Sequence, residues 1–325
     1  MTAYTCAYTR HPATGWRVVK LSATDPASGL KTVAQFTPEV GANLLGLAVG
    51  ETEYLVDVDR AAGNRILGTP ILYPTPNRIR DGVFTFGGRT FRFAPNMGRN
   101  FIHGLVREIP WECGEPIVTP QGLSITAHYT FAPGSAPYDL FPIRNTLELT
   151  YTLRPSALRL EFTVRNEDER ELLPFGLAIH PYFRIIGPRE AVRIQVPAQR
   201  WMEAVELLPT GRLVDLAHGP ADLSQPTPLT HLNLDDVFWG LEPARPQVIY
   251  YDQLGTQVTL TAAELFTHSV VYTPQGRGYF CLENQSCSTD THNLYARGLQ
   301  EAAHLTLLAP GQALRAWVEL TVGTQ

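Results

Sequence analysis

The sequence predicts an all-β protein, a large antiparallel β-sandwich, and three observations lead to this expectation. Apolar and polar residues alternate over many short segments, as they do on strands that bury one face. No segment keeps the i, i+3, i+4, i+7 spacing of an amphipathic helix for more than about two turns. The 325 residues include 26 glycines and 26 prolines, which is above average usage and favours short strands joined by turns.

The clearest alternation predicts a β-hairpin. Residues 146–153 alternate between polar and apolar side chains, and residues 158–164 repeat the pattern after a turn at Arg154-Pro155-Ser156. A second hairpin is expected for residues 84–86 and 90–93, because Gly87 and Gly88 lie between them. The same period predicts strands over residues 16–21, 123–131, 192–196, 248–251, 257–262, 268–272 and 314–322.

The chain shows no sign of internal division. No composition shift, repeat or flexible linker interrupts it. Strands are not separated by patterns of helix length, which disfavours a parallel βαβ architecture. We therefore expect residues 1–325 to form a single β-sandwich domain.

Composition excludes several classes of function. The chain has 26 Lys and Arg against 31 Asp and Glu, a net charge of −5, and it has no basic stripe, so we expect no nucleic-acid partner. Lys20 and Lys31 are the only lysines, which leaves little room for Schiff-base chemistry or a lysine phosphate loop. The first residues lack a signal-peptide pattern and the apolar runs are too short to cross a bilayer. A cytoplasmic protein with no membrane partner is expected.

Metal and redox chemistry have weak support in the sequence. The four cysteines, Cys6, Cys113, Cys281 and Cys287, lack CxxC spacing and are expected to be free thiols. The nine histidines form neither HxH nor HExxH, so we expect no metal site and no cofactor. The sequence carries no signal that would define an oligomeric state.

Four short segments place ionisable groups among apolar or aromatic neighbours, where burial perturbs protonation. They are residues 73–82 with Arg78 and Arg80, residues 102–104 with His103, residues 174–183 with His180, and residues 279–285 with Glu283 and Gln285. Asp235, beside Asp236, is a further candidate.

Each of these side chains, taken alone, also fits an ordinary structural role. His103 and the pair of aspartates fit turns, and Glu283 could end an apolar strand by pairing with an arginine. On an extended segment, Arg78 and Arg80 would point the same way. By the same rule His180 would share a face with Tyr182, and Glu283 with Gln285 if the strand continues.

Taken together and in order, the segments resemble the aldose 1-epimerase (galactose mutarotase) family. The shared motifs are Asn77-Arg78-Ile79 before a GxFxFxGxxFxF hairpin, His103-Gly104, HPYF from His180, Leu234-Asp235, LENQ at 282–285 and APGQ at 309–312. Only the ordered set is specific, and it runs from about residue 40 to the C-terminus. The resemblance implies a supersandwich of large antiparallel sheets, which agrees with the alternation.

The resemblance also implies an activity and its residues. It implies an isomerase that interconverts the α and β anomers of a free aldose, without metal or cofactor, with Glu283 as general base and His180 as general acid. The sugar would be held by Arg78, His103, Asp235 and Gln285. A base removes the anomeric proton while an acid protonates the ring oxygen, and the opened ring then closes on its other face. We expect an ionised Glu283, and a modest rise in the pKa of His180 that keeps it protonated near neutrality.

Two passages depart from the family pattern. Arg184-Ile185 follows HPYF where galactose mutarotases usually have Asn-Leu, and residues 105–111 form a shorter passage than in the galactose enzymes. The substrate can therefore be a sugar other than galactose. Trp111 fits either a stacking platform for a sugar or a core position.

Three other functions stay open at this point. Arg80 and Arg107 would suit a phosphorylated sugar, because arginine binds phosphate bidentately. A non-catalytic sugar-binding protein could use the same scaffold. A glycosidase would use Asp235 and Glu283 as its pair of carboxylates.

Overall fold

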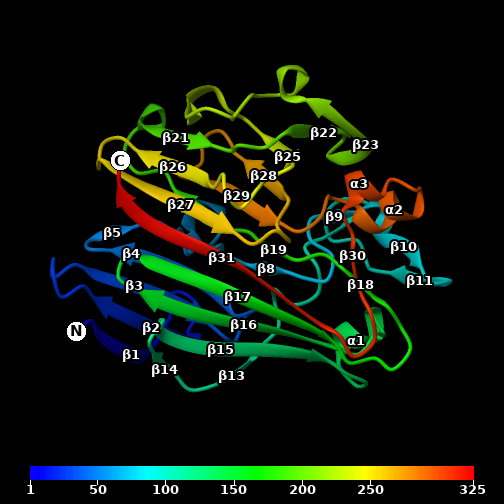
Figure 1. Cartoon of the computed structure of the whole chain (residues 1–325), viewed down its shortest axis with the longest axis horizontal. Coiled ribbons are helices and arrows are strands. Elements are labelled where there is room, and N and C mark those ends of the chain that lie inside the picture. The colour runs from blue at the N-terminus through cyan, green and yellow to red at the C-terminus, as the bar shows by residue number, and fades with distance from the viewer.

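The computed structural model describes residues 1–325, apart from the side chain of residue 61. Its strands gather into three large antiparallel sheets and several two-stranded pairs (Figure 1). The helices are short, and the longest has six residues. The predicted all-β class is therefore confirmed.

The largest sheet has ten strands and crosses the front of the view in Figure 1. Its order is β13-β15-β16-β17-β31-β27-β26-β21-β24, with β14 paired to β15. The strands are β13 (Glu112–Cys113), β14 (Ile117–Thr119), β15 (Gly122–Phe131), β16 (Asn145–Arg154), β17 (Ala157–Asn166), β21 (Val192–Gln195), β24 (Thr227–Pro228), β26 (Gln247–Tyr251), β27 (Thr256–Ala262) and β31 (Ala313–Thr324).

The predicted hairpin forms the centre of this sheet. β16 and β17 pair along their whole length, from Asn145 opposite Asn166 to Arg154 opposite Ala157. Leu147, Leu149 and Tyr151 are buried, while Thr150 lies on the other face, where its Oγ1 is 2.8 Å from Thr126 Oγ1 of β15. The alternation thus places one face of the hairpin in the core.

A second sheet has eight strands in the order β23-β22-β25-β28-β29-β19-β8, with β20 also paired to β29. The strands are β8 (Ile71–Leu72), β19 (Ala178–Ile179), β20 (Tyr182–Arg184), β22 (Arg200–Val205), β23 (Leu208–Asp215), β25 (Asp235–Trp239), β28 (His268–Tyr272) and β29 (Tyr279–Gln285). β29 pairs with β28 on one edge and with β19 and β20 on the other. It therefore lies inside the sheet.

The third sheet contains five strands in sequence order, and two of them, β2 and β3, pack against β16. Its strands are β1 (Ala3–Arg10), β2 (Arg17–Thr24), β3 (Lys31–Thr37), β4 (Asn43–Val49) and β5 (Thr52–Glu53). The two-stranded pairs join β6 (Val58–Asp59) to β7 (Arg65–Ile66), β9 (Arg78–Ile79) to β12 (Phe101–Ile102), β10 (Val83–Phe86) to β11 (Arg89–Arg92), and β18 (Leu173–Phe175) to β30 (Thr306–Leu308).

The remaining regular elements are short helical segments. They are α1 (Ala136–Leu140), α2 (Thr291–Ala296) and α3 (Gln300–Ala303), with the 3-10 turns η1 (Arg60–Ala62), η2 (Arg80–Gly82), η3 (Arg189–Ala191), η4 (Leu216–His218) and η5 (Leu229–His231). No helix in the part of the chain that the structure describes combines the length and apolar character needed to cross a membrane.

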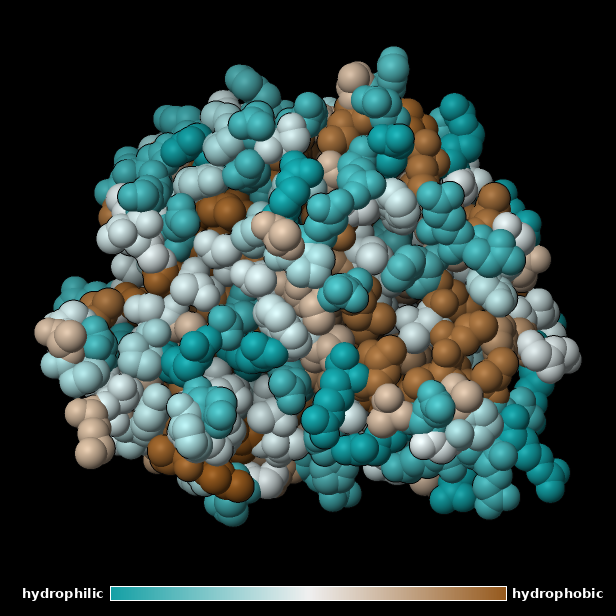
Figure 2. Space-filling view, in the orientation of Figure 1, coloured by the Kyte–Doolittle hydropathy of each residue, from teal (hydrophilic) through white to brown (hydrophobic). Residues whose placement is uncertain are grey.

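One cluster of buried side chains draws on all three large sheets. Hydrophilic and neutral side chains cover most of the face shown in Figure 2, as expected when the apolar residues face inward. Trp111 belongs to this core, because it is buried and its Nε1 donates to Val106 O at 3.1 Å. The interpretation of Trp111 as a stacking platform is therefore wrong. The four cysteines are free, as predicted.

Candidate active site

The site is built around β29, which is buried along its whole length. Glu283 and Gln285 lie two residues apart and share a face of the strand. Gln285 Nε2 donates to Glu283 Oε2 at 3.0 Å. The strand therefore continues through Gln285, which fulfils the condition under which the sequence placed the two residues on one face, and the amide orients the carboxyl group.

His180 lies between β19 and β20, directly beside Glu283. Its backbone N–H donates to Pro70 O at 3.0 Å, and its Nε2 lies 3.2 Å from Glu283 Oε1. The imidazole stacks on the Tyr182 ring at 4.6 Å, and it meets the edge of His103 at 5.2 Å between centroids. Tyr182 thus shares a face with His180, as predicted, and the two rings fix the orientation of the imidazole.

Arg78 and Asp235 form a partly buried polar pair near these groups. Arg78 Nη2 donates to Asp235 Oδ2 at 3.1 Å, and Arg78 Nη1 donates to Asn77 Oδ1 at 3.1 Å. Asp235 begins β25 and lies opposite Tyr272. The interpretation of Asp235 and Asp236 as a turn is therefore wrong, because both belong to a strand.

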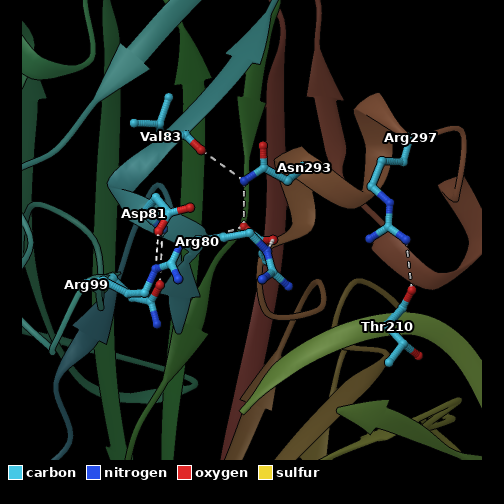
Figure 3. A network of polar contacts seen from close by, with 9 residues as sticks. Arg80, Asp81, Val83, Arg99, Thr210, Asn293 and Arg297 are labelled. Carbon is cyan, nitrogen blue, oxygen red and sulfur yellow. Dashed lines mark hydrogen bonds and ion pairs between the residues drawn. The ribbon is translucent and has the colours of Figure 1, made fainter. Parts of the chain in front are cut away.

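Arg80 pairs with a different carboxylate from Arg78, although only one residue separates the two arginines. The chain leaves the extended conformation at η2, where Asp81 has a φ of 55°. Arg80 Nε lies 3.8 Å from Asp290 Oδ2, and Figure 3 shows Arg80 in a separate polar network with Asp81, Arg99 and Asn293. The expectation that the two arginines point the same way is therefore wrong.

His103 reaches the site from a tight turn. β12 pairs with β9, with Ile102 opposite Arg78. His103 and Gly104 follow with φ values of 74° and 69°. A Cβ on Gly104 would lie 2.4 Å from Tyr73 O, so only glycine fits there. His103 is thus both a turn residue and a site residue.

These side chains surround one cavity of about 120 Å³. Its walls are formed by Arg65, Asn77, Arg78, Met97, Ile102, His103, His180, Tyr182, Asp235, Val270, Tyr272 and Glu283. Five of the six predicted site residues lie on this wall, and Gln285 reaches it through Glu283. Arg65, Met97 and Tyr272 lie outside the recognised motifs, so only the fold places them there.

Burial controls the protonation of the central pair. It lowers the pKa of His180 to about 3 and raises the pKa of Glu283 well above its ordinary value. Burial also lowers the pKa of His103 well below its ordinary value. The expected rise in the pKa of His180 is therefore wrong. Burial thus favours the uncharged form of both groups across the 3.2 Å contact.

The pair also belongs to a group of three potential metal ligands. One ligand atom from each of His180, Cys281 and Glu283 lies within 4.8 Å of the other two, and such a donor set suits Zn²⁺. Burial raises the pKa of the Cys281 thiol well above its ordinary value, which disfavours the thiolate that a metal binds.

Solved structures of similar fold cover nearly the whole chain. A galactose mutarotase-like protein from Clostridium acetobutylicum superposes with a TM-score of 0.86 at 18% identity, over 99% of both chains. The galactose 1-epimerase from Lactobacillus acidophilus gives a TM-score of 0.75 at 15% identity, over 100% of this chain and 99% of the other. At these identities the likeness concerns the fold.

Comparison of sequences also finds relatives of this chain. The uncharacterized protein YphB of Escherichia coli is 25% identical over 77% of this chain and 82% of its own length. Galactose mutarotase of Sus scrofa is 26% identical over 47% of this chain and 44% of its own length. The family model described as aldose 1-epimerase matches residues 31–321, and the chain therefore belongs to the aldose 1-epimerase family.

Proposed function

We propose that the protein is an aldose 1-epimerase, a mutarotase that interconverts the α and β anomers of an aldose by opening and closing its ring. The observation that carries this proposal is the contact of 3.2 Å between His180 Nε2 and Glu283 Oε1 on the wall of a polar cavity. The two groups are close enough to contact the anomeric hydroxyl and the ring oxygen of one sugar, because both oxygens are bonded to C1.

Glu283 acts as the base on the anomeric hydroxyl, and His180 acts as the acid on the ring oxygen. The pair holds one proton, and ring opening takes one proton from the sugar and returns one to it. The reactive form arises when the proton moves from Glu283 to His180 Nε2. Arg78 and the hydrogen bond from Gln285 both favour the carboxylate, so they support this form. Ring closure on the other face reverses the two roles.

The other polar groups hold the sugar. Arg78 and Asp235 present a donor fork and an acceptor to the cavity, which suits vicinal hydroxyl groups. His103, kept neutral by burial, offers an uncharged ring nitrogen. Removing Asp235 should therefore weaken substrate binding more than it slows the chemical step.

The test is polarimetry of freshly dissolved α-D-glucose and α-D-galactose with wild type, Glu283→Gln and His180→Asn. We expect wild type to accelerate the approach to the final rotation and each variant to lose about 10²–10⁴-fold in rate. Asp236→Asn is the matched control, because Asp236 accepts a bond from Trp201 Nε1 at 3.1 Å outside the cavity wall. Full activity in both folded variants would refute the assignment. Saturable sugar binding by wild type without faster anomer exchange would identify a binding protein instead.

A further inference from the structure

A second cavity, of about 490 Å³, adjoins the one that contains the catalytic pair. The two have five wall residues in common, namely Arg65, Met97, Ile102, His103 and Tyr182. The two cavities therefore adjoin each other, and we refer to them together as the hollow. Glu283, His180 and Asp235 line only the first part of it.

The second cavity carries more positive than negative charge. Arg65 and Arg107 both line it. In the part of the chain that the structure describes, the Arg65 guanidinium makes one hydrogen bond. Its Nη2 donates to Tyr182 Oη at 3.4 Å. Arg107 Nη2 lies 2.8 Å from Oε1 of Glu108, whose side chain is 72% exposed. Among the wall residues of this cavity, the one carboxylate, that of Glu108, stands against two guanidinium groups.

Both arginines lie close enough to the catalytic cavity to act on it. Their positive charges add to the effect of burial in lowering the pKa of His103 and of His180. An anion bound between the two guanidinium groups would therefore also reduce the field that opposes a protonated His180.

The chemistry of the sugar indicates which of its groups reaches this second cavity. The ring oxygen is bonded to both C1 and C5, so a substituent on C5 lies on the side of the ring oxygen. In the proposed mechanism that side faces His180. The rings in contact with His180, those of Tyr182 and His103, form the boundary between the two cavities. The C6 substituent of the sugar is thus directed toward Arg65 and Arg107.

We infer that the second cavity binds an anionic group on C6 of the aldose, a phosphate ester or a carboxylate. The inference rests on the proposed function for the orientation of the sugar. Guanidinium groups donate parallel N–H bonds to two oxygens of such an anion. Arg107 was one of the two arginines that the sequence offered for this purpose. Arg65 takes the place of Arg80, which binds Asp290 outside the hollow.

The experiment compares D-glucose, D-glucose 6-phosphate and D-glucuronate by polarimetry, with the spontaneous rate of each sugar subtracted. We expect kcat/KM of wild type for at least one anionic sugar to exceed that for glucose by about tenfold or more. In the double variant Arg65→Gln/Arg107→Gln this ratio should fall to about one. Arg80→Gln, which removes an arginine outside both cavities, should leave the ratio unchanged.

The outcomes separate this inference from the proposed function. A preference for one of the two anionic sugars identifies the phosphate or the carboxylate as the ligand. A ratio of about one or below in wild type, or a ratio that survives in the double variant, overturns the inference. If no sugar is turned over, calorimetric titration with the same sugars decides. Arginine-dependent binding of an anionic sugar then supports the second cavity while the proposed function fails, and no binding overturns both.

Discussion

At the scale of single residues, Gln285 is the side chain whose hydrogen bond lowers the pKa of Glu283. Its amide donates to the Glu283 carboxyl from the same face of β29 and is fully buried with it. A hydrogen bond to the charged form of an acid lowers its pKa, here against the larger effect of burial. Gln285 is thus a positioning residue that keeps the proposed base within reach of ionisation.

Replacing Gln285 by leucine should raise the pKa of Glu283 further. Because the carboxylate is the active form, the acidic limb of the kcat/KM profile should move to higher pH, and kcat/KM near neutrality should fall about tenfold. Gln195→Leu, on β21 outside the cavity, is the control. Rate profiles across pH check this. A uniform loss of rate without a shift of the limb would show that Gln285 acts only on structure.

Five residues of the candidate site could be named from the sequence, but their protonation and directions could not. The order of the motifs selected Glu283, His180, Arg78, His103 and Asp235, and the fold brings all of them to one cavity. The burial that lowers the pKa of His180 is a property of the packed sheet. Arg80 pairs with Asp290 while Arg78 pairs with Asp235, which no alternation pattern reveals.

At the scale of elements, the turn after β12 determines where His103 lies. Two successive residues with positive φ reverse the chain there, and Gly104 packs against the backbone of Tyr73. This contact holds the turn against the segment that leads into β9. The position of the His103 ring depends on it.

Gly104→Ala should lower the free energy of unfolding and also reduce activity. A left-handed alanine costs about 1 kcal/mol, and the contact with Tyr73 O should add about 1–3 kcal/mol because backbone must move. Gly276→Ala isolates the first cost, since Gly276 has a φ of +71° and open space around it. Urea denaturation measures both variants. Equal losses in the two would show that the packing against Tyr73 contributes nothing.

The long alternating strands were predictable, and the sheet at the N-terminus largely was not. β15, β16, β17, β27 and β31 each bury one face, and this produces the period of two. β4 is buried along most of both faces, so its sequence is simply apolar and carries no period. Strands of two residues, such as β9 and β12, are too short to leave any pattern.

At the scale of the whole molecule, buried histidines make stability depend on pH. Burial lowers the pKa of His292 to about 4, while its Nε2 contacts Pro174 O at 3.1 Å and its ring stacks on Phe84. In the unfolded chain this pKa is about 6.5. Between these values the unfolded state binds more protons, so the contribution of His292 is fully present above pH 6.5 and is lost as the pH falls toward 4.

The free energy of unfolding of His292→Gln should therefore change less between pH 7 and pH 5 than that of wild type. The difference in slope should approach about 1.4 kcal/mol per pH unit. We compare the slopes of two proteins because the raised pKa values of Glu53 and Glu283 make the free energy of unfolding fall as the pH rises, which is opposite to the effect of His292. Half-exposed His128 supplies the control variant His128→Gln. Parallel slopes for wild type and His292→Gln would contradict the prediction.

The two parts of the hollow are built from different kinds of structure. Glu283 and Asp235 belong to paired strands inside the eight-stranded sheet. Arg107 lies in a connecting segment, and Arg65 on a strand of two residues outside the large sheets. Mutations in such connections are tolerated far better than mutations in paired strands. Evolution, or a directed library over Arg65 and Arg107, can therefore change which sugars the proposed epimerase accepts while its acid and base stay untouched.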